Sequence, residues 1–209
     1  MMTNLRDYIG ELQQTLDYLP ESVIDETVNL LHEARLEHRQ VFIFGNGGSA
    51  ATASHFVCDL QKNTRCEDLP NFRATGLMDM SILSALANDE GYDQIFAQQL
   101  ESFIHPGDIV MAISTSGNSS NVINAVKLAR RHGALTIGFT GFDGGKLGEL
   151  VDIHIHVPSN NIEYVEDVHL ILEHFICKEL KIKANEIALR HLVLLLNPSA
   201  VPETNEVGG

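Results

Sequence analysis

Two short loops, rich in glycine and hydroxyl side chains, hold the residues best suited to bind an anionic ligand. They span residues 43–50 and 113–119, and each follows an apolar run and precedes a helical pattern. Open α/β sheets bind ligands where their strands end in such loops. Ser and Thr hydroxyls and backbone N–H groups at a helix N-terminus can surround a phosphate, and the helix dipole favours its charge. The two loops therefore predict a phosphorylated small molecule as the ligand.

Each loop also has a simpler interpretation. The second is compatible with an ordinary turn and helix cap, although four hydroxyls around one glycine are unusual for that purpose. In the first, Gly45, Gly47 and Ala50 match the G-x-G-x-x-A pattern of dinucleotide-binding folds. A nicotinamide enzyme also needs an acid after the second strand, where Asp79 is a loose candidate. The hydroxyl-rich loop has no place in such an enzyme, so phosphate binding is favoured.

His55 and Asp59 have the residue types for acid–base or metal chemistry. They lie four residues apart in the helix predicted after the first loop, and therefore on one helix face. A surface ion pair has this spacing, and so does a metal ligand beside a carboxylate base. The spacing alone leaves both interpretations open.

Candidate partners for this pair lie in the last predicted helix. Glu166 and His174 are separated by a rise of ~12 Å and a rotation of ~80°, so both reach one ion only if their side chains lean together. His169, three residues after Glu166, is the geometrically easier partner. We expect the neighbouring Glu173 to be solvated.

The composition indicates a globular protein that binds neither nucleic acid nor a membrane. Of the 209 residues, 44% are hydrophobic and 20% are charged, as in ordinary folded domains. The net charge of −14 argues against a nucleic-acid surface, which needs clustered Lys and Arg. No apolar run reaches the ~18 residues that span a bilayer.

The three cysteines, Cys58, Cys66 and Cys177, show no metal-type spacing. We therefore expect a reduced, cytoplasmic protein, and we expect Cys58 to pack in the core.

The whole chain alternates between strand and helix patterns. Apolar runs predict strands at residues 41–44, 73–77, 109–113, 135–140 and 153–157. Helical spacing predicts two N-terminal helices within residues 4–38, broken near Pro20, four helices between strands (about 47–63, 79–88, 94–103 and 122–132), and a closing helix over about 163–190. The expected fold is an α/β three-layer sandwich with a doubly wound, five-stranded parallel sheet in residues 41–158. We assign residues 1–195 to a single domain and residues 196–209 to a loose tail.

Several segments between about residue 4 and residue 182 share the order of motifs found in one known family. These are Gly45-Asn46-Gly47-Gly48-Ser49-Ala50, His55, Ala87-Asn88-Asp89, Ala112-Ile113-Ser114-Thr115-Ser116-Gly117-Asn118-Ser119, Thr140-Gly141-Phe142-Asp143-Gly144-Gly145 and Val168-His169. The chain resembles the sugar isomerase (SIS) superfamily and, within it, the phosphoheptose isomerases. The resemblance implies an SIS-type fold and the isomerisation of sedoheptulose 7-phosphate. It also implies zinc binding and a homotetramer with active sites between its subunits.

The resemblance assigns roles by position in this sequence. It implies that the phosphate is held by Ser114, Thr115, Ser116 and Ser119 and the sugar by Asn46 and Ser49. It also implies that Asp89 and Glu166 bind the substrate and that Asp89 and Thr115 line the site. It places the metal on His55, Asp59, Glu166 and His174, and therefore prefers His174 to His169. Asp59 takes the role of base and His174 that of acid in a proton transfer through an enediol.

The chain departs from the family pattern inside this cluster. The family has Glu where this chain has Asp59, Gln where it has Glu166, and Arg where it has Asn63. A second function class is therefore kept, a non-catalytic SIS module that senses a sugar phosphate or serves as a scaffold, as the replication initiator-associating proteins do. Those relatives have lost part of the acid and imidazole cluster. Two imidazoles and two carboxylates are retained here, which favours the enzyme.

Overall fold

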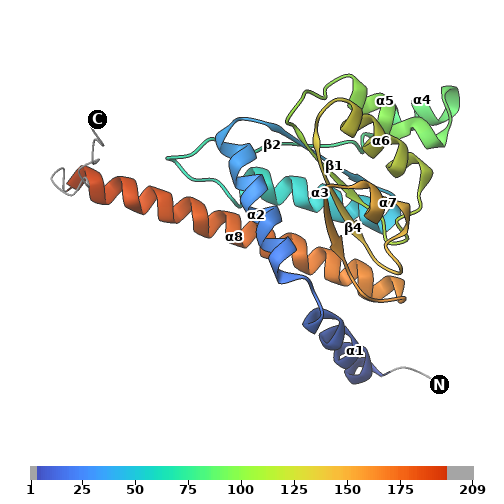
Figure 1. The fold of residues 1–209 in the computed structure, drawn as a ribbon, viewed down its shortest axis with the longest axis horizontal. Helices are drawn as coiled ribbons and strands as arrows, with labels where there is room; N and C mark the ends of the chain where they lie inside the picture. Colours follow the sequence, from blue (N-terminus) through green and yellow to red (C-terminus); the bar gives the residue numbers. More distant parts are fainter. Residues whose placement is uncertain (1–3, 197–209) are drawn as a thin grey trace, which may run out of the picture.

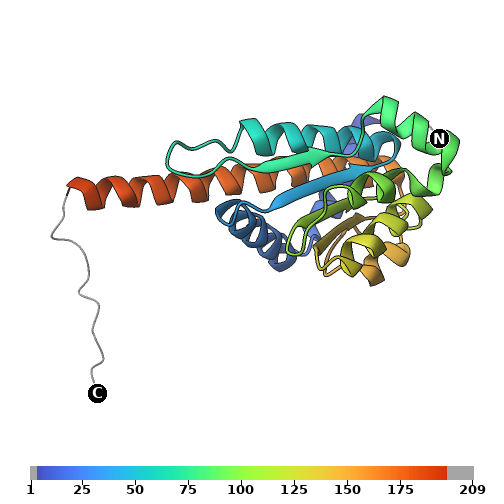
Figure 2. The same cartoon turned by 90° about the horizontal axis from the view of Figure 1, so that it is seen from above.

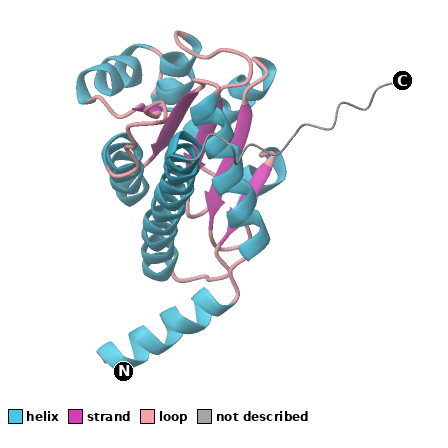
Figure 3. Cartoon of the chain, turned by 90° about the vertical axis from the view of Figure 1, so that its left-hand side faces the viewer, coloured by secondary structure: helices cyan, strands magenta, loops and turns pink. Residues whose placement is uncertain are grey.

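The computed structural model describes residues 4–196, in which a five-stranded parallel sheet lies between two layers of helices (Figure 3). In spatial order the strands are β2 (Arg73–Gly76), β1 (Gln40–Gly45), β3 (Ile109–Ile113), β4 (Leu135–Thr140) and β5 (Ile153–His156). All neighbouring strands pair in parallel. The predicted α/β fold class is confirmed.

The helices form a layer on each face of the sheet. Their bounds are α1 (Leu5–Asp17), α2 (Glu21–Leu36), α3 (Gly47–Lys62), α4 (Met80–Asp89), α5 (Ile95–Glu101), α6 (Ser120–Arg131), α7 (Gly145–Leu150) and α8 (Ile162–Leu196). Helices α2, α3 and α8 pack on one face, and α5, α6 and α7 pack on the other. No helix within residues 4–196 combines the length and the apolar character needed to cross a bilayer.

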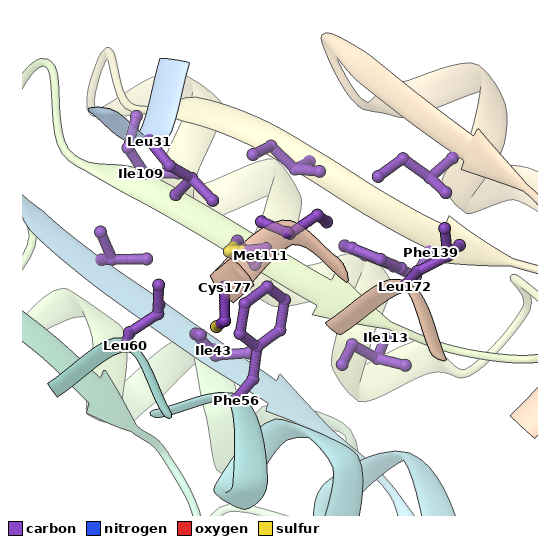
Figure 4. Close-up of a cluster of buried hydrophobic side chains, with 14 of the residues drawn as sticks. Leu31, Ile43, Phe56, Leu60, Ile109, Met111, Ile113, Phe139, Leu172 and Cys177 are labelled. Carbon is purple, nitrogen blue, oxygen red and sulfur yellow. The ribbon is translucent and has the colours of Figure 1, made fainter. Parts of the chain in front are cut away.

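Each central strand contributes to both cores because its side chains alternate between the two faces. In β1, Ile43 packs into the core under α2, α3 and α8, whereas Phe42 and Phe44 pack into the core under α5 and α6. Figure 4 shows the first core, where Phe56 of α3 and Leu172 of α8 meet the strands. Burial on both faces explains why these strands appear in the sequence as continuous apolar runs.

Helices α1 and α8 extend away from the sheet. Pro20 separates α1 from α2, and α1 contacts the first turns of α8, below which it lies in Figure 1. There the Tyr8 hydroxyl donates to Asp167 Oδ2 at 2.7 Å and the Tyr164 hydroxyl donates to Glu11 Oε2 at 2.9 Å. The C-terminal half of α8 projects beyond the sheet in both side views (Figures 1 and 2).

Three elements differ from the prediction. Helix α7, between β4 and β5, was not predicted. Two of its six residues are glycines, which disfavour helix, and Leu147 is its buried residue. The segment after Gly91 forms a 3-10 turn, η1 (Tyr92–Gln94), before the short α5. Helix α8 continues to Leu196, six residues beyond the expected end. The rest of the expected tail, residues 197–209, lies outside the described residues, and the single domain stays a prediction.

Leu31 tests the packing of α2 on the sheet. Its side chain is fully buried in the core below α2, so Leu31→Ala is expected to lower the free energy of unfolding by about 2–5 kcal/mol. Leu36, on the same helix, is 42% exposed, and Leu36→Ala is expected to cost less than about 1 kcal/mol. Chemical denaturation of both variants measures the difference. Equal losses would contradict the packing described here.

Candidate active site

The two hydroxyl- and glycine-rich loops lie side by side at the carboxyl ends of neighbouring strands. Strands β1 and β3 are adjacent, and Gly45 is in register with Ile113. A side chain at Gly45 is excluded, because a Cβ there would lie 2.7 Å from both Ile113 O and Ser49 Cβ. The chain thus brings the start of α3 against the start of α6, as the sequence predicted.

The second loop is held in a fixed shape by the loop after β4. Gly117 has φ +63°, and a Cβ there would collide with the carbonyl oxygen of Gly144. Thr115 O accepts a hydrogen bond from Gly141 N at 2.8 Å, and Gly117 O accepts one from Leu147 N at 2.9 Å. The loop is therefore ordered by backbone contacts, which leaves its hydroxyls available to a ligand.

The hydroxyls of this loop surround the N-terminus of α6. Ser119 is the N-cap residue of α6, but its side chain makes no capping hydrogen bond. Ser114 is nearly buried, and its Oγ lies 3.4 Å from Ser119 Oγ. Ser116 is exposed, and its Oγ accepts from Asn118 N at 3.2 Å. Uncapped N–H groups of a helix, together with several hydroxyls, form an anion site.

Asn46 of the first loop is oriented by two residues that the sequence analysis did not single out. Its side-chain amide exchanges two hydrogen bonds of 2.9 Å with the amide of the buried Asn121. The Tyr92 hydroxyl donates to Asn46 Oδ1, also at 2.9 Å. Asn121 follows the hydroxyl-rich loop, and Tyr92 follows the Asn88–Gly91 turn, so only the fold reveals their common target. Ser49 lies close by and is buried.

Asp89 is not brought to these loops by any described contact. It is exposed at the end of α4, where it accepts a hydrogen bond from Asn88 Nδ2 at 2.7 Å. Its role in substrate binding stays a prediction.

A second group of side chains lies farther along α3, where α3 packs against α8. His55, Asp59, Glu173 and His174 each offer one ligand atom within 4.8 Å of the others. The rings of His55 and His174 meet edge-on with centroids 4.9 Å apart. The two histidines are half-exposed, whereas both carboxylates are buried. Three of the four metal ligands implied by the family resemblance therefore lie together.

Glu173 contradicts the expectation of a solvated side chain, because it is fully buried. Its Oε1 accepts a weak hydrogen bond from the Cys177 thiol at 3.8 Å. Its Oε2 lies 3.4 Å from His174 Nε2 but accepts no hydrogen bond from any described residue. Burial, with a further contribution from the Asp59 charge, raises the pKa of Glu173 to about 7. The spacing of residues in the sequence did not indicate that Glu173 is buried in this cluster.

Glu166 lies apart from this cluster. Its carboxylate covers the first turn of α3, where a Cβ at Gly48 would be 2.5 Å from Glu166 Oε1. The structure thus places Glu166 beside the first loop, which agrees with its expected role in substrate binding. It does not place Glu166 with His55, Asp59 and His174, as the expected metal set required.

His169 is not available as a ligand, which agrees with the choice of His174. It is 1% exposed, and its Nε2 lies 3.3 Å from the carbonyl oxygen of Thr140. Burial lowers the pKa of His169 to about 4 and keeps the ring neutral. The expected packing of Cys58 in the core is wrong, because Cys58 faces outward from α3.

Comparisons with known proteins agree with this fold and site. A family model described as the SIS domain matches residues 6–141. The phosphoheptose isomerase of Aliarcobacter butzleri is 42% identical over 171 residues, which cover 79% of this chain and 89% of that protein. That of Bordetella avium is 37% identical over 180 residues, which cover 85% and 91%.

Solved structures give the same result. A phosphoheptose isomerase from Francisella tularensis superposes with a TM-score of 0.79 at 30% identity, covering 86% of this chain and 99% of that one. The phosphoheptose isomerase of Neisseria gonorrhoeae gives a TM-score of 0.76 at 32% identity, covering 84% and 96%. The chain belongs to the SIS domain family and, within it, to the phosphoheptose isomerases, as its motifs predicted.

Gly117 tests the shape of the second loop. Gly117→Ala is expected to lower the free energy of unfolding by at least about 2 kcal/mol, because the new Cβ meets Gly144 O in a backbone conformation with positive φ. Gly10→Ala is the matched control, since a Cβ at Gly10 in α1 meets nothing, and alanine favours the helix by up to about 1 kcal/mol. Denaturation midpoints compare the two. A neutral Gly117→Ala would contradict the loop geometry.

Proposed function

We propose that the protein interconverts sedoheptulose 7-phosphate and an aldose heptose 7-phosphate. The observation that carries this proposal is the pairing of a hydroxyl-rich loop at the α6 N-terminus with an acid and imidazole cluster between α3 and α8. The names of the relatives supply the substrate. A non-catalytic SIS module would not need this cluster, so its presence supports the enzyme.

The two loops hold the phosphate and the sugar. The phosphate dianion lies at the N-terminus of α6, where the helix dipole favours its charge. It accepts hydrogen bonds from the hydroxyls of Ser114, Thr115, Ser116 and Ser119. Asn46, oriented by Asn121 and Tyr92, and Ser49 bind sugar hydroxyls. Binding energy from the phosphate then positions the reacting carbons, which is worth several orders of magnitude in rate.

Asp59 and His174 transfer the proton. Asp59 removes the carbon-bound proton next to the carbonyl group, and His174 protonates the carbonyl oxygen, which gives the enediol. Asp59 then returns its proton to the neighbouring carbon while His174, which has given up its proton, takes the proton of the hydroxyl on the first carbon, and this forms the aldehyde. Burial of Asp59 beside half-exposed imidazoles partly shields the base from water.

His55, Asp59 and His174 fit a zinc ion. Imidazole nitrogen and carboxylate oxygen are zinc ligands, each at ~2 Å, so the ligand atoms around one ion lie within about 4 Å of one another. The 4.8 Å limit found for this cluster needs only small side-chain adjustments. When bound, zinc polarises the substrate carbonyl and stabilises the negative charge of the enediolate.

A homotetramer with active sites between subunits is part of the proposal. Exposed apolar side chains on α1 and α8, among them Ile9, Phe175 and Ile182, offer surfaces for contacts between copies. Ser49 and Asp59 lie ~15 Å apart along the α3 axis, so a sugar held at the first loop would reach an Asp59 supplied by a second copy more easily.

The free cysteines among residues 4–196 fit a cytoplasmic location.

Asp59 tests the assigned base. Asp59→Asn is expected to abolish turnover of sedoheptulose 7-phosphate, because the amide cannot accept the proton, while binding of the sugar phosphate is retained. Cys58→Ser, an exposed neighbour on α3, is the control and should keep turnover. Coupled product assays and calorimetric binding measure both quantities, with a panel of C5 to C7 ketose phosphates and with or without zinc. Unchanged turnover would remove Asp59 from the mechanism.

Ser116 tests the phosphate loop. Ser116→Ala is expected to weaken binding of the sugar phosphate about 10–100-fold, because a hydrogen bond to a charged group is lost. Ser102→Ala, at an exposed serine after α5, should leave binding unchanged. Titration calorimetry with sedoheptulose 7-phosphate measures both. Equal affinities would place the phosphate elsewhere.

A further inference from the structure

Glu173 is a buried carboxylate without a compensating charge. Among the described residues neither lysine nor arginine forms an ion pair with it, and the basic side chain that it contacts is the imidazole of His174. The nearest acid, Asp59, is also buried and adds repulsion. Burying a carboxylate without a counter-charge or full hydrogen bonding is strongly unfavourable, so such groups are normally paired or bound to a metal.

The geometry of the orphaned oxygen points to a cation. Glu173 Oε2 has no hydrogen-bond donor and is 3.4 Å from a ring nitrogen of His174. Glu173 belongs to the same group of possible metal ligands as His55 and Asp59. A divalent ion at this point would neutralise both carboxylates at once and would take two nitrogens and two oxygens, a set that zinc accepts.

Glu166 lies on the same stripe of α8 but is about two turns (~10 Å) nearer the N-terminus of the helix. Side chains of an α-helix lean towards its N-terminus, so the Glu166 carboxylate points away from the cluster. It lies instead over Gly48, in the first turn of α3. The start of α3 meets Glu166, and the later turns of α3 meet Glu173 and His174.

We propose that Glu173 is the fourth metal ligand that α3 and α8 of one subunit supply, and that Glu166 binds the sugar beside the first loop. The two acids thus divide tasks that the family resemblance assigns together to Glu166. The sugar half of this inference rests on the proposed isomerase function, whereas the metal half concerns the protein without substrate.

Zinc binding to the metal-depleted full-length protein tests the metal half. Competition with a chromophoric chelator gives the zinc affinity without any assay of turnover. Glu173→Gln is expected to weaken zinc binding by more than about 100-fold, beyond the loss seen for an outer-shell partner. Glu166→Gln is the matched control, because it makes the same change on the same helix. Its zinc affinity should stay within about threefold of wild type, since no ligand of the ion is lost. Loss of zinc in Glu166→Gln but not in Glu173→Gln would overturn the proposal.

The stability of the zinc-free protein separates a ligand from a structural residue. A ligand that is buried without compensation destabilises the empty site, so Glu173→Gln is expected to keep or raise the melting temperature without zinc. Zinc should raise the melting temperature of wild type and of Glu166→Gln, but hardly that of Glu173→Gln. A lower melting temperature of zinc-free Glu173→Gln, with normal zinc affinity, would show a structural role and overturn the proposal.

Calorimetry with sedoheptulose 7-phosphate tests the sugar half. Glu166→Ala is expected to weaken binding of this sugar phosphate at least about tenfold, because the acceptor for sugar hydroxyls is removed. Unchanged sugar binding in Glu166→Ala would overturn the role of Glu166. If wild type binds zinc but turns over none of the C5 to C7 ketose phosphates, the isomerase proposal fails while the assignment of Glu173 stands.

Discussion

The pairing of β1 with β3 is the constraint on which the site depends. These strands are neighbours in space although β2 and the helices α3, α4 and α5 lie between them in the sequence. Their register sets Gly45 beside Ile113, so the loops that follow must share one edge of the sheet. Small residues there let the α3 and α6 N-termini approach each other, and their dipoles then favour an anion at the same place.

The parallel packing of α3 and α8 adds the second half of the site. Both helices follow strands of one parallel sheet and return along the same face, so their residues meet in matching order. Gly48 meets Glu166 near the start of each helix, and His55 and Asp59 meet Glu173 and His174 farther along. One helix pair therefore presents a sugar-facing acid and a metal-facing cluster at different levels, and neither level requires a loop to move.

The sequence predicted those features that depend on local patterns. The continuous apolar run of β3 and the hydroxyl loop after it were visible without a structure, because strands buried on both faces and helix caps have strong compositional signatures. Helix α7 was not predicted, because its two glycines disfavour a helix. The burial of Glu173 was not predicted, because α8 carries apolar residues on all sides. The sequence of α8 therefore has no polar face that would show which of its acids are exposed to solvent. Only the contact with α3 decides that.

Asp59 and Glu173 are best understood as one adjustment. The family resemblance implies glutamate at the position of Asp59, and aspartate is shorter by one carbon–carbon bond of ~1.5 Å. The Glu173 carboxylate approaches from the facing helix and has an oxygen within 4.8 Å of an Asp59 oxygen. Its uncompensated burial lowers the stability of the protein without a cation, so cation binding and folding stability are coupled. A side chain that weakens the empty protein is retained most readily where it binds something, and beside two imidazoles and Asp59 the proposed metal ion is that partner.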